Sequence, residues 1–416
     1  MEVLEEAFRR AKGLAFTPWD VRNLFVPDVL VAPFVRIGGL NAAVIPFIAL
    51  GALTIWMVYR LAWRWSGDAT AALAAAALFA FHWIPLGFAS TVYPRNLAAA
   101  CIVAAALLAD RAPFAAGGLT GIAFADRFSE IVYLIPLLIL GKKRMRILFG
   151  TIVVSTIVVG VYDWITWGSP FSSLIKFAHL TLVAPDFASR VKYQPLWWYL
   201  LNVARWCAPT LLPLLWVGRK SIRWSWLVVP LLAFSLVRHK ELRYLQGMIP
   251  FLAIAGGIGF AILLRKRRAA AVALLGISLL WDLHGLRYLA HKSMPAVMAA
   301  RVMAADPHIH TIALSQPWAY GDRLFLGEKN LRDIGAPPRD LAAFAGADAV
   351  ALYETDLDHP DLVAALHAHG FIAWRTFRDG PARAVVVYVR RLSSTSLSDT
   401  SDRARRSARR RGSSVP

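Results

Sequence analysis

The densest group of residues able to do chemistry is the stretch RHKELRYL at 238–245, which lies between two long apolar runs. Its ionisable side chains are those of Arg238, His239, Lys240, Glu241 and Arg243. A charge near the centre of a membrane helix costs roughly 2.5–3.5 kcal/mol, so such groups pair with one another or meet an anionic ligand. Several cations beside one carboxylate favour a phosphate-binding site. A solvated turn at a membrane surface is the alternative.

Three other charged residues lie at the ends of apolar runs. Asp163 ends a run in VYDWITWGSPF, where the carboxylate and the tryptophans that follow it could line a sugar-binding pocket. An aromatic belt with an incidental acid is the alternative. Arg95 and Arg127 each lie where two apolar runs meet. Either side chain reaches toward lipid headgroups or binds a phosphate through its planar guanidinium.

The composition indicates the elements that must position these residues. Hydrophobic residues make up 57% of the 416 positions, and the mean hydropathy is +0.50. They form runs of about the 20 residues that a helix needs to cross a bilayer, without the alternation of a barrel strand. We therefore expect an all-α polytopic membrane protein in contact with membrane lipids. The two cysteines, Cys101 and Cys207, lie in apolar runs and predict buried free thiols rather than a disulfide or a metal site.

The net charge of +20 follows the same pattern of runs. Basic clusters fill every second loop, and short basic loops stay in the cytoplasm, so the charge predicts membrane topology rather than binding of nucleic acid. The resulting ten spans are 41–63, 69–90, 96–110, 113–125, 129–141, 146–164, 196–217, 224–238, 244–265 and 269–285. This topology places Arg95, Arg127 and residues 238–243 on the outer face. It also places both chain ends outside, and we expect the natural protein to have an earlier first span that this sequence lacks.

Four regions follow from this pattern. Residues 1–40 form a first extracytoplasmic loop with amphipathic helices, in which Glu2, Glu5 and Glu6 fit a solvated face. Residues 41–286 form the transmembrane bundle, and residues 287–392 form a soluble α/β domain outside the membrane. Its expected strands are 311–315, 347–353, 371–377 and 384–390, with helices at 295–305, 338–345 and 360–369. The Ser- and Arg-rich residues 393–416 predict a disordered basic tail.

Several of these segments resemble one known family. HKELRYL at 239–245 resembles the HKEERF-type motif of glycosyltransferase family 22, whose members transfer mannose from polyprenyl or dolichyl phosphate. Weaker similarities follow in the same order along residues 1–285: LEEAFR at 4–9, FTPWDVRNLFVP at 16–27, YPRNLAAA at 93–100, LTGIAFADR at 119–127, YDWITWGSPFSSLIKF at 162–177 and YQPLWWYL at 193–200.

The resemblance implies a GT-C fold, an inverting reaction without an essential metal or cofactor, and a catalytic aspartate in the first loop. Alignment of the first-loop segments places that aspartate about two residues before Met1, which agrees with an N-terminal truncation. Within the chain, the matching first-loop positions are Trp19, Asp20 and Arg22. Asp20 is then a secondary catalytic carboxylate, and Trp19 and Arg22 are candidate substrate-binding residues.

These observations predict an enzyme that moves a sugar, expected to be mannose, from a polyprenyl-phosphate donor to a lipid-linked glycan acceptor. We expect a plasma-membrane protein with its active site on the extracytoplasmic face. His239, Lys240 and Arg243 would bind the donor phosphate with help from Arg127 or Arg95. Glu241 would orient Lys240 or Arg243, and Asp163 would line the pocket. A transporter or flippase of a lipid-linked intermediate, or a catalytically inactive GT-C-like subunit, are the alternatives.

Overall fold

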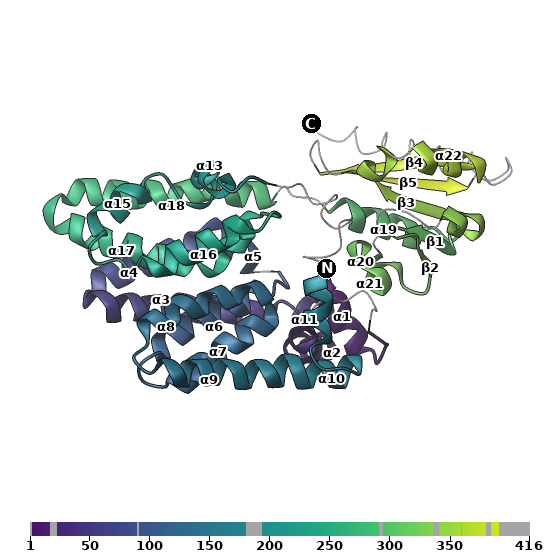
Figure 1. Ribbon diagram of the computed structural model, residues 1–416. Coiled ribbons are helices and arrows are strands. Elements are labelled where there is room, and N and C mark those ends of the chain that lie inside the picture. The colour runs from purple at the N-terminus through teal and green to yellow at the C-terminus, as the bar shows by residue number, and fades with distance from the viewer. Residues whose placement is uncertain are drawn as a thin grey trace, which may run out of the picture. The chain divides into compact units, whose positions relative to one another are not determined.

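The computed structural model describes residues 2–16, 23–89, 91–179, 194–290, 294–315, 317–335, 341–358, 360–379 and 384–390. The chain divides into two compact units, Glu2–Lys292 and Ser293–Pro416. The first unit is helical and the second contains a five-stranded sheet (Figure 1). The boundary lies a few residues beyond the predicted position of 286 because the last helix of the first unit continues to Ala290.

The first unit contains helices at almost every segment predicted to cross the membrane. Their bounds are α1 Glu2–Ala11, η1 Val26–Val31, α2 Ala32–Ala42, α3 Ile45–Ser66, α4 Ala69–Phe81, α5 Trp83–Ala89, α6 Arg95–Leu108, α7 Pro113–Asp126, η2 Phe128–Tyr133, α8 Leu134–Leu140, α9 Arg144–Ser155, η3 Thr156–Val161, α10 Tyr162–Trp167, α11 Ser172–Ala178, α13 Trp198–Leu201, α14 Val203–Trp206, α15 Leu211–Gly218, α16 Ser225–Leu236, η5 Leu242–Gly247, α17 Ile249–Lys266 and α18 Arg268–Ala290.

Four helical stretches in the described residues are long and apolar enough to cross a membrane: Ile45–Ser66, Arg144–Trp167, Ile249–Lys266 and Arg268–Arg287. The pair α4 and α5 would make a fifth, with a bend of 58°. The bend follows from Pro85, which cannot donate to the carbonyl of Phe81, and His82 adopts an extended backbone there. The protein is therefore a multi-pass helical membrane protein. The total of ten crossings stays a prediction, since α6, η2–α8 and α16 are shorter apolar helices.

The predicted span 196–217 is wrong as a single helix, because the structure divides it into α13, α14 and α15. Pro209 disfavours helical geometry at the residue before it, and Cys207 is extended. The break leaves backbone carbonyl groups without helical hydrogen bonds, and lipid cannot supply replacements. Side chains from other helices form these hydrogen bonds instead. Trp83 Nε1 donates to the Arg205 carbonyl at 2.7 Å, Trp281 Nε1 donates to the Ala204 carbonyl at 2.8 Å, and His82 Nε2 lies 3.0 Å from the Trp206 carbonyl oxygen.

Small residues let the helices approach closely, as is usual for helix pairs in membranes. A Cβ atom at Gly117 of α7 would lie 1.9 Å from the Ile147 carbonyl oxygen of α9, which runs alongside it (Figure 1). The GGIG stretch at 256–259 of α17 serves helix packing in the same way. A Cβ atom at Gly259 would lie 1.9 Å from the Leu214 carbonyl oxygen of α15.

Replacing Gly259 with alanine should therefore lower the stability of the bundle by about 1–3 kcal/mol, because the new methyl group overpacks the α15–α17 contact. Gly276 of α18 provides the matched control, since a Cβ atom there meets nothing within 4 Å. We expect Gly276→Ala to leave the thermal midpoint of the detergent-solubilised protein unchanged or slightly raised. Equal midpoints for the two variants would contradict this packing role.

The first-loop region folds against the start of the bundle. Buried apolar residues of α1, η1 and α2 pack together with Phe47 of α3. The Arg9 guanidinium donates to the Glu5 carboxylate at 2.9 Å, and Arg10 forms an ion pair with Asp28 at 2.6 Å. The prediction that Glu5 and Glu6 lie on a solvated face is wrong, because their side chains are buried. They are buried because tertiary packing covers this face of α1 and, for Glu5, because Arg9 supplies a counter-charge.

The second unit is an α/β domain, as predicted. Its strands are β1 Thr311–Leu314, β2 Asn330–Asp333, β3 Ala349–Tyr353, β4 Phe371–Arg378 and β5 Ala384–Arg390, in the order β2-β1-β3-β5-β4. The helices are α19 Pro295–Ala305, α20 Pro317–Tyr320, α21 Asp322–Leu326, η6 Leu341–Gly346, η7 Glu354–Asp358 and α22 Pro360–Ala368. β1 pairs in parallel with β2 and β3, and β5 pairs antiparallel with β3 and β4.

Several elements of this domain differ from the prediction, which also lacked the short helices α20, α21 and η7. The sequence analysis missed β2, because this short edge strand reads NLRD and has neither an apolar run nor a clear alternation. The predicted helix at 338–345 is in the structure a short 3-10 segment, η6, and residues 336–340 lie outside the described residues. The predicted tail at 393–416 also lies outside them.

Candidate functional site

The loop between α16 and α17 carries the charged motif, and its geometry separates the members of that motif. The Lys240 ammonium donates to the backbone carbonyls of Gln194 at 3.1 Å and Val237 at 2.5 Å. Lys240 is only 5% exposed. Its charge is therefore used to hold the loop backbone. Glu241 contacts Arg243, one of the two cations that it was expected to orient.

The side chains of His239, Glu241 and Arg243 form a connected and partly exposed set. His239 Nε2 lies 3.5 Å from one Glu241 carboxylate oxygen, and Arg243 Nε donates to the other. The Arg243 side chain is 45% exposed. Although burial opposes ionisation, His239 and Arg243 hold the pKa of Glu241 well below its usual range. Glu241 thus stays ionised at neutral pH and acts as a counter-charge rather than as a proton acceptor.

Arg95 lies beneath this loop and is buried. Its guanidinium forms an ion pair with the Glu130 carboxylate, and the Glu130 side chain is 1% exposed. The same guanidinium lies 4.5 Å from the centre of the Tyr244 ring, a cation–π contact. Arg95 therefore links α6, η2 and the motif loop. This use of its charge differs from the expected contact with a donor phosphate.

Two more contacts connect the same three segments. The Gln246 side-chain amide donates to the Asn96 side-chain oxygen. Gly247 packs against the Tyr133 ring, where a Cβ atom would lie 2.9 Å from the hydroxyl oxygen. Residues 93–96, 128–133 and 244–247 consequently hold the motif loop in one position. Glu130 was not among the predicted site residues, although an ionisable residue within a predicted span is itself a signal of function.

Tyr93 is a buried side chain on which several arginines of this region act. Its ring stacks on that of Phe88 with centroids 4.4 Å apart, and the Arg243 guanidinium lies 6.0 Å from the ring centre. Burial raises the pKa of Tyr93, and the positive charges of Arg95, Arg243 and Arg127 oppose that rise. Arg127 thus contributes positive charge at Tyr93 together with Arg95 and Arg243, and its role in binding a phosphate stays a prediction.

Buried polar atoms that lack a partner concentrate here. The buried side-chain atoms of this region that make no hydrogen bond within the described residues include the hydroxyl groups of Tyr93 and Tyr133, His239 Nδ1 and Gln246 Oε1. Buried polar groups in folded proteins normally have partners. Their gathering at one place fits a region that holds water or the polar part of a ligand.

Asp163 belongs to a different group of contacts. It is 0% exposed. Asn23 Nδ2 donates to one carboxylate oxygen at 2.9 Å, and the backbone N–H and hydroxyl of Ser173 donate to the other at 2.8 and 2.6 Å. Asp163 therefore ties residue 23 to α11. Trp19, Asp20 and Arg22 lie at 17–22, outside the described residues. Within the described ranges, no three His, Cys, Asp or Glu residues are grouped as metal ligands.

Comparisons with known proteins place this site in context. A search of curated proteins finds no match. The chain is similar to the solved structure of ArnT from Cupriavidus metallidurans in the apo state, with a TM-score of 0.59 and 14% identity over 93% of this chain and 92% of that chain. The same protein bound to undecaprenyl phosphate gives a TM-score of 0.61, with 14% identity and the same coverage.

The apo form of the Archaeoglobus fulgidus oligosaccharyltransferase is also similar, with a TM-score of 0.50 and 13% identity over 95% of this chain and 71% of that chain. At these identities the similarity shows a shared fold, and the expected GT-C-like fold is confirmed. Residues 49–310 match the model of the Alg9-like mannosyltransferase family, which covers more than half of the chain. The resemblance to glycosyltransferase family 22 is thereby confirmed, and the chain belongs to the Alg9-like mannosyltransferase family.

Proposed function

We propose that this membrane protein transfers mannose from a polyprenyl phosphate to a lipid-linked glycan on the extracytoplasmic side. The observation that carries the proposal is the partly exposed set of His239, Glu241 and Arg243 in the loop between α16 and α17, to which Arg127 adds positive charge at Tyr93. A planar guanidinium suits the phosphate of such a donor. Family membership supports mannose as the sugar. The fold shared with ArnT, a structure solved with undecaprenyl phosphate, supports the polyprenyl carrier.

The proposed reaction is a single displacement with inversion at the anomeric carbon. The bond from that carbon to the phosphate oxygen breaks as a bond to an acceptor hydroxyl oxygen forms. Negative charge develops on the departing phosphate, where the Arg243 guanidinium and an N–H group of His239 stabilise it. The acceptor proton passes to a carboxylate. Glu241 is a poor choice for this role because hydrogen bonds from His239 and Arg243, and the charge of Arg243, keep its pKa low. We assign the proton to a first-loop carboxylate, with Asp20 as the candidate in this chain.

Arg95, Lys240 and Asp163 become positioning residues in this proposal. Lys240 holds the backbone of the motif loop. The Arg95 guanidinium positions the Tyr244 ring through a cation–π contact. Asp163 accepts hydrogen bonds from Asn23 and Ser173 and so positions residue 23 of the first loop. None of the three needs to touch the sugar for its substitution to lower the rate.

The direct experiment is a transfer assay in membranes with radiolabelled polyprenyl-phosphate sugars. We expect mannose to be transferred to a lipid-linked product, and polyprenyl-phosphate glucose to serve poorly. Transfer of another sugar with equal efficiency would overturn the assignment of mannose. Absence of transfer by well-folded protein with every donor would favour an inactive subunit.

The side of the membrane can be tested by labelling single cysteines. Arg238 lies in the motif loop and Lys220 lies in the loop before α16, and both are exposed. The native Cys101 and Cys207 are buried. In intact cells, a membrane-impermeant maleimide should label the Arg238→Cys variant and leave the Lys220→Cys variant unlabelled until the membrane is opened. The reverse pattern would place the site in the cytoplasm and contradict the proposal.

A further inference from the structure

Exposed cations gather at the end of the helical unit away from the motif loop. The motif loop joins α16 to α17, whereas segments 218–224 and 265–268 lie before α16 and after α17, at the other ends of these two helices. With three further segments they contain fourteen lysine and arginine residues, all exposed, and only two acids, Asp68 and Asp110. The five segments are 60–68, 109–112, 141–146, 218–224 and 265–268.

Two ion pairs join three of these segments. Arg265 Nη2 lies 2.5 Å from an Asp68 carboxylate oxygen, and Arg64 Nη2 lies 3.1 Å from an Asp110 carboxylate oxygen. These pairs connect segment 60–68 with the other two segments. They also use both acids, so the other cations of the five segments form no ion pair with a described residue.

The two remaining segments contact the same group. A Cβ atom at Gly141 would lie 3.7 Å from the Ala109 carbonyl oxygen, which places 141–146 beside 109–112. The Arg223 guanidinium lies 5.0 Å from the centre of the Trp65 ring, which places 218–224 beside 60–68. Tertiary packing therefore gathers five segments that are distant in the sequence into one positively charged surface, called the basic end below.

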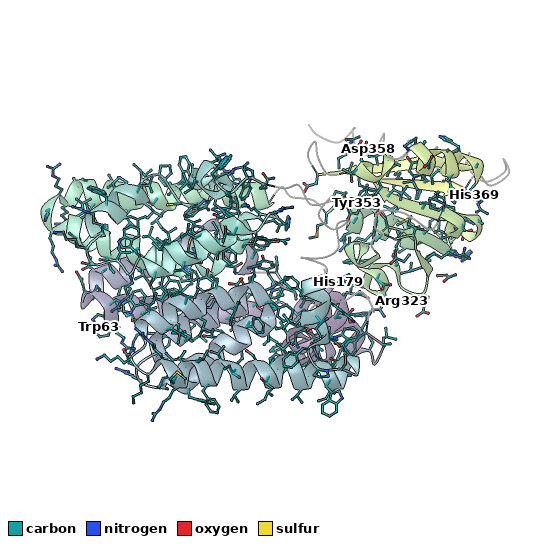
Figure 2. All side chains as sticks on the ribbon, viewed as in Figure 1. Trp63, His179, Arg323, Tyr353, Asp358 and His369 are labelled. Atoms are coloured by element: carbon teal, nitrogen blue, oxygen red, sulfur yellow. The ribbon has the colours of Figure 1, made fainter. Side chains whose placement is uncertain are left out.

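Exposed tryptophans accompany this charge. Trp56, Trp63 and Trp216 are 54%, 46% and 68% exposed, and Figure 2 shows Trp63 at this end of the helical unit. The Arg60 guanidinium lies 5.5 Å from the centre of the Trp56 ring and 5.9 Å from that of Trp63. Tryptophans of membrane proteins are enriched at the level of the lipid headgroups. They thus indicate that the basic end lies where lipid phosphates are found.

A second arginine is fixed over a tryptophan in the loop between α15 and α16. The Arg219 guanidinium lies 4.4 Å from the centre of the Trp216 ring, and its Nη1 donates to the Trp216 carbonyl oxygen at 2.8 Å. Trp224 Nε1 donates to the Arg219 carbonyl oxygen at 2.9 Å and so holds the loop backbone. A cation–π contact uses the face of the ring, so the exposed guanidinium keeps N–H groups with which to bind a phosphate.

We propose that Arg60, Arg219 and Arg223, each held over a tryptophan ring, bind the phosphate groups of anionic phospholipids. The other cations of the basic end attract the negatively charged membrane surface. A phosphatidylcholine headgroup carries its own cation beside the phosphate, so it is attracted less. A soluble polyanion would match the charge but would give no reason for the exposed tryptophans. Binding makes and breaks no bond, and it does not depend on which sugar the protein transfers.

Native mass spectrometry of the full-length protein in detergent tests this surface, with phosphatidylglycerol as the probe and phosphatidylcholine of the same acyl chains as the reference. We expect phosphatidylglycerol to bind more tightly. The triple variant Arg60→Ala, Arg219→Ala and Arg223→Ala should weaken its binding about fivefold or more, since each cation near an anionic lipid contributes about that factor. Phosphatidylcholine that binds the parent protein as tightly as phosphatidylglycerol would overturn the proposal.

A matched triple variant separates the arginines held over tryptophans from positive charge in general. Lys142→Ala, Lys143→Ala and Arg146→Ala together remove the same charge from the same end, and none of these side chains lies over an aromatic ring of the described residues. This variant should keep most of the affinity for phosphatidylglycerol. Equal weakening by the two triple variants would show a general attraction only and would overturn the proposed sites.

Trp216→Leu keeps every charge and tests the support of Arg219 directly. Because Trp216 is exposed, the variant should keep its thermal midpoint in the absence of lipid. We expect it to bind phosphatidylglycerol about two- to fivefold more weakly, the usual worth of an exposed cation–π contact. Unchanged binding would contradict the role of the ring. Arg243→Ala should bind this lipid as the parent protein does, so a failure of the proposed sugar transfer is distinguishable from a failure here.

Discussion

Replacing Arg243 with alanine should lower the rate of sugar transfer by about 10²–10³-fold, the usual effect of removing one group that stabilises charge in a transition state. Arg243 is the most exposed member of the set formed with His239 and Glu241, so it is the cation best placed to meet a phosphate. Glu241 keeps its contact with His239 in the variant. We therefore expect the protein to fold normally and kcat to fall more than KM rises.

Two matched variants make this result specific. Arg238→Ala removes an exposed cation from the same loop and should retain most of the activity. Arg243→Lys keeps the charge but loses the planar fork, so it should recover only part of the rate. Equal activities for Arg243→Ala and Arg238→Ala in the labelled-donor assay would remove Arg243 from the proposed phosphate site.

Breaking the buried pair of Arg95 and Glu130 should have the largest effect on stability. Arg95→Met leaves the Glu130 carboxylate buried without its cation, a loss of about 3–5 kcal/mol. We expect little monodisperse protein after solubilisation. The double variant Arg95→Met and Glu130→Leu removes both charges and should recover most of the yield and of the thermal midpoint, because well-packed apolar residues replace a buried pair at little cost.

The double variant also tests whether Arg95 positions the motif loop. Without the guanidinium beneath Tyr244, the loop loses a fixed support, and we expect transfer to stay well below that of the parent despite restored folding. A double variant with full activity would show that the pair serves stability alone. A single variant as stable as the double variant would contradict the buried ion pair itself.

The sequence by itself determined the class of protein and the region of the site. Apolar runs of bilayer length predict helices, since only helices and closed barrels satisfy the backbone in lipid. Dense charge between such runs is costly, so residues 238–243 were identifiable as a candidate site. The order of apolar strand, helix and strand near residue 350 likewise predicted the α/β domain. These signals are local in the sequence, so they can be interpreted without knowledge of the tertiary contacts.

Only the tertiary structure decided what each charge does. Along the sequence, Lys240 and Arg243 are equivalent cations three positions apart, but one holds backbone carbonyls and the other stays exposed. Arg95 pairs with Glu130, which lies 35 positions later in the sequence. Gln246 forms a hydrogen bond with Asn96, which lies 150 positions earlier. Burial depends on which distant segments pack together, and no local pattern encodes that pairing. The same reason explains why Asp163, beside tryptophans in the sequence, lies fully enclosed by Asn23 and Ser173.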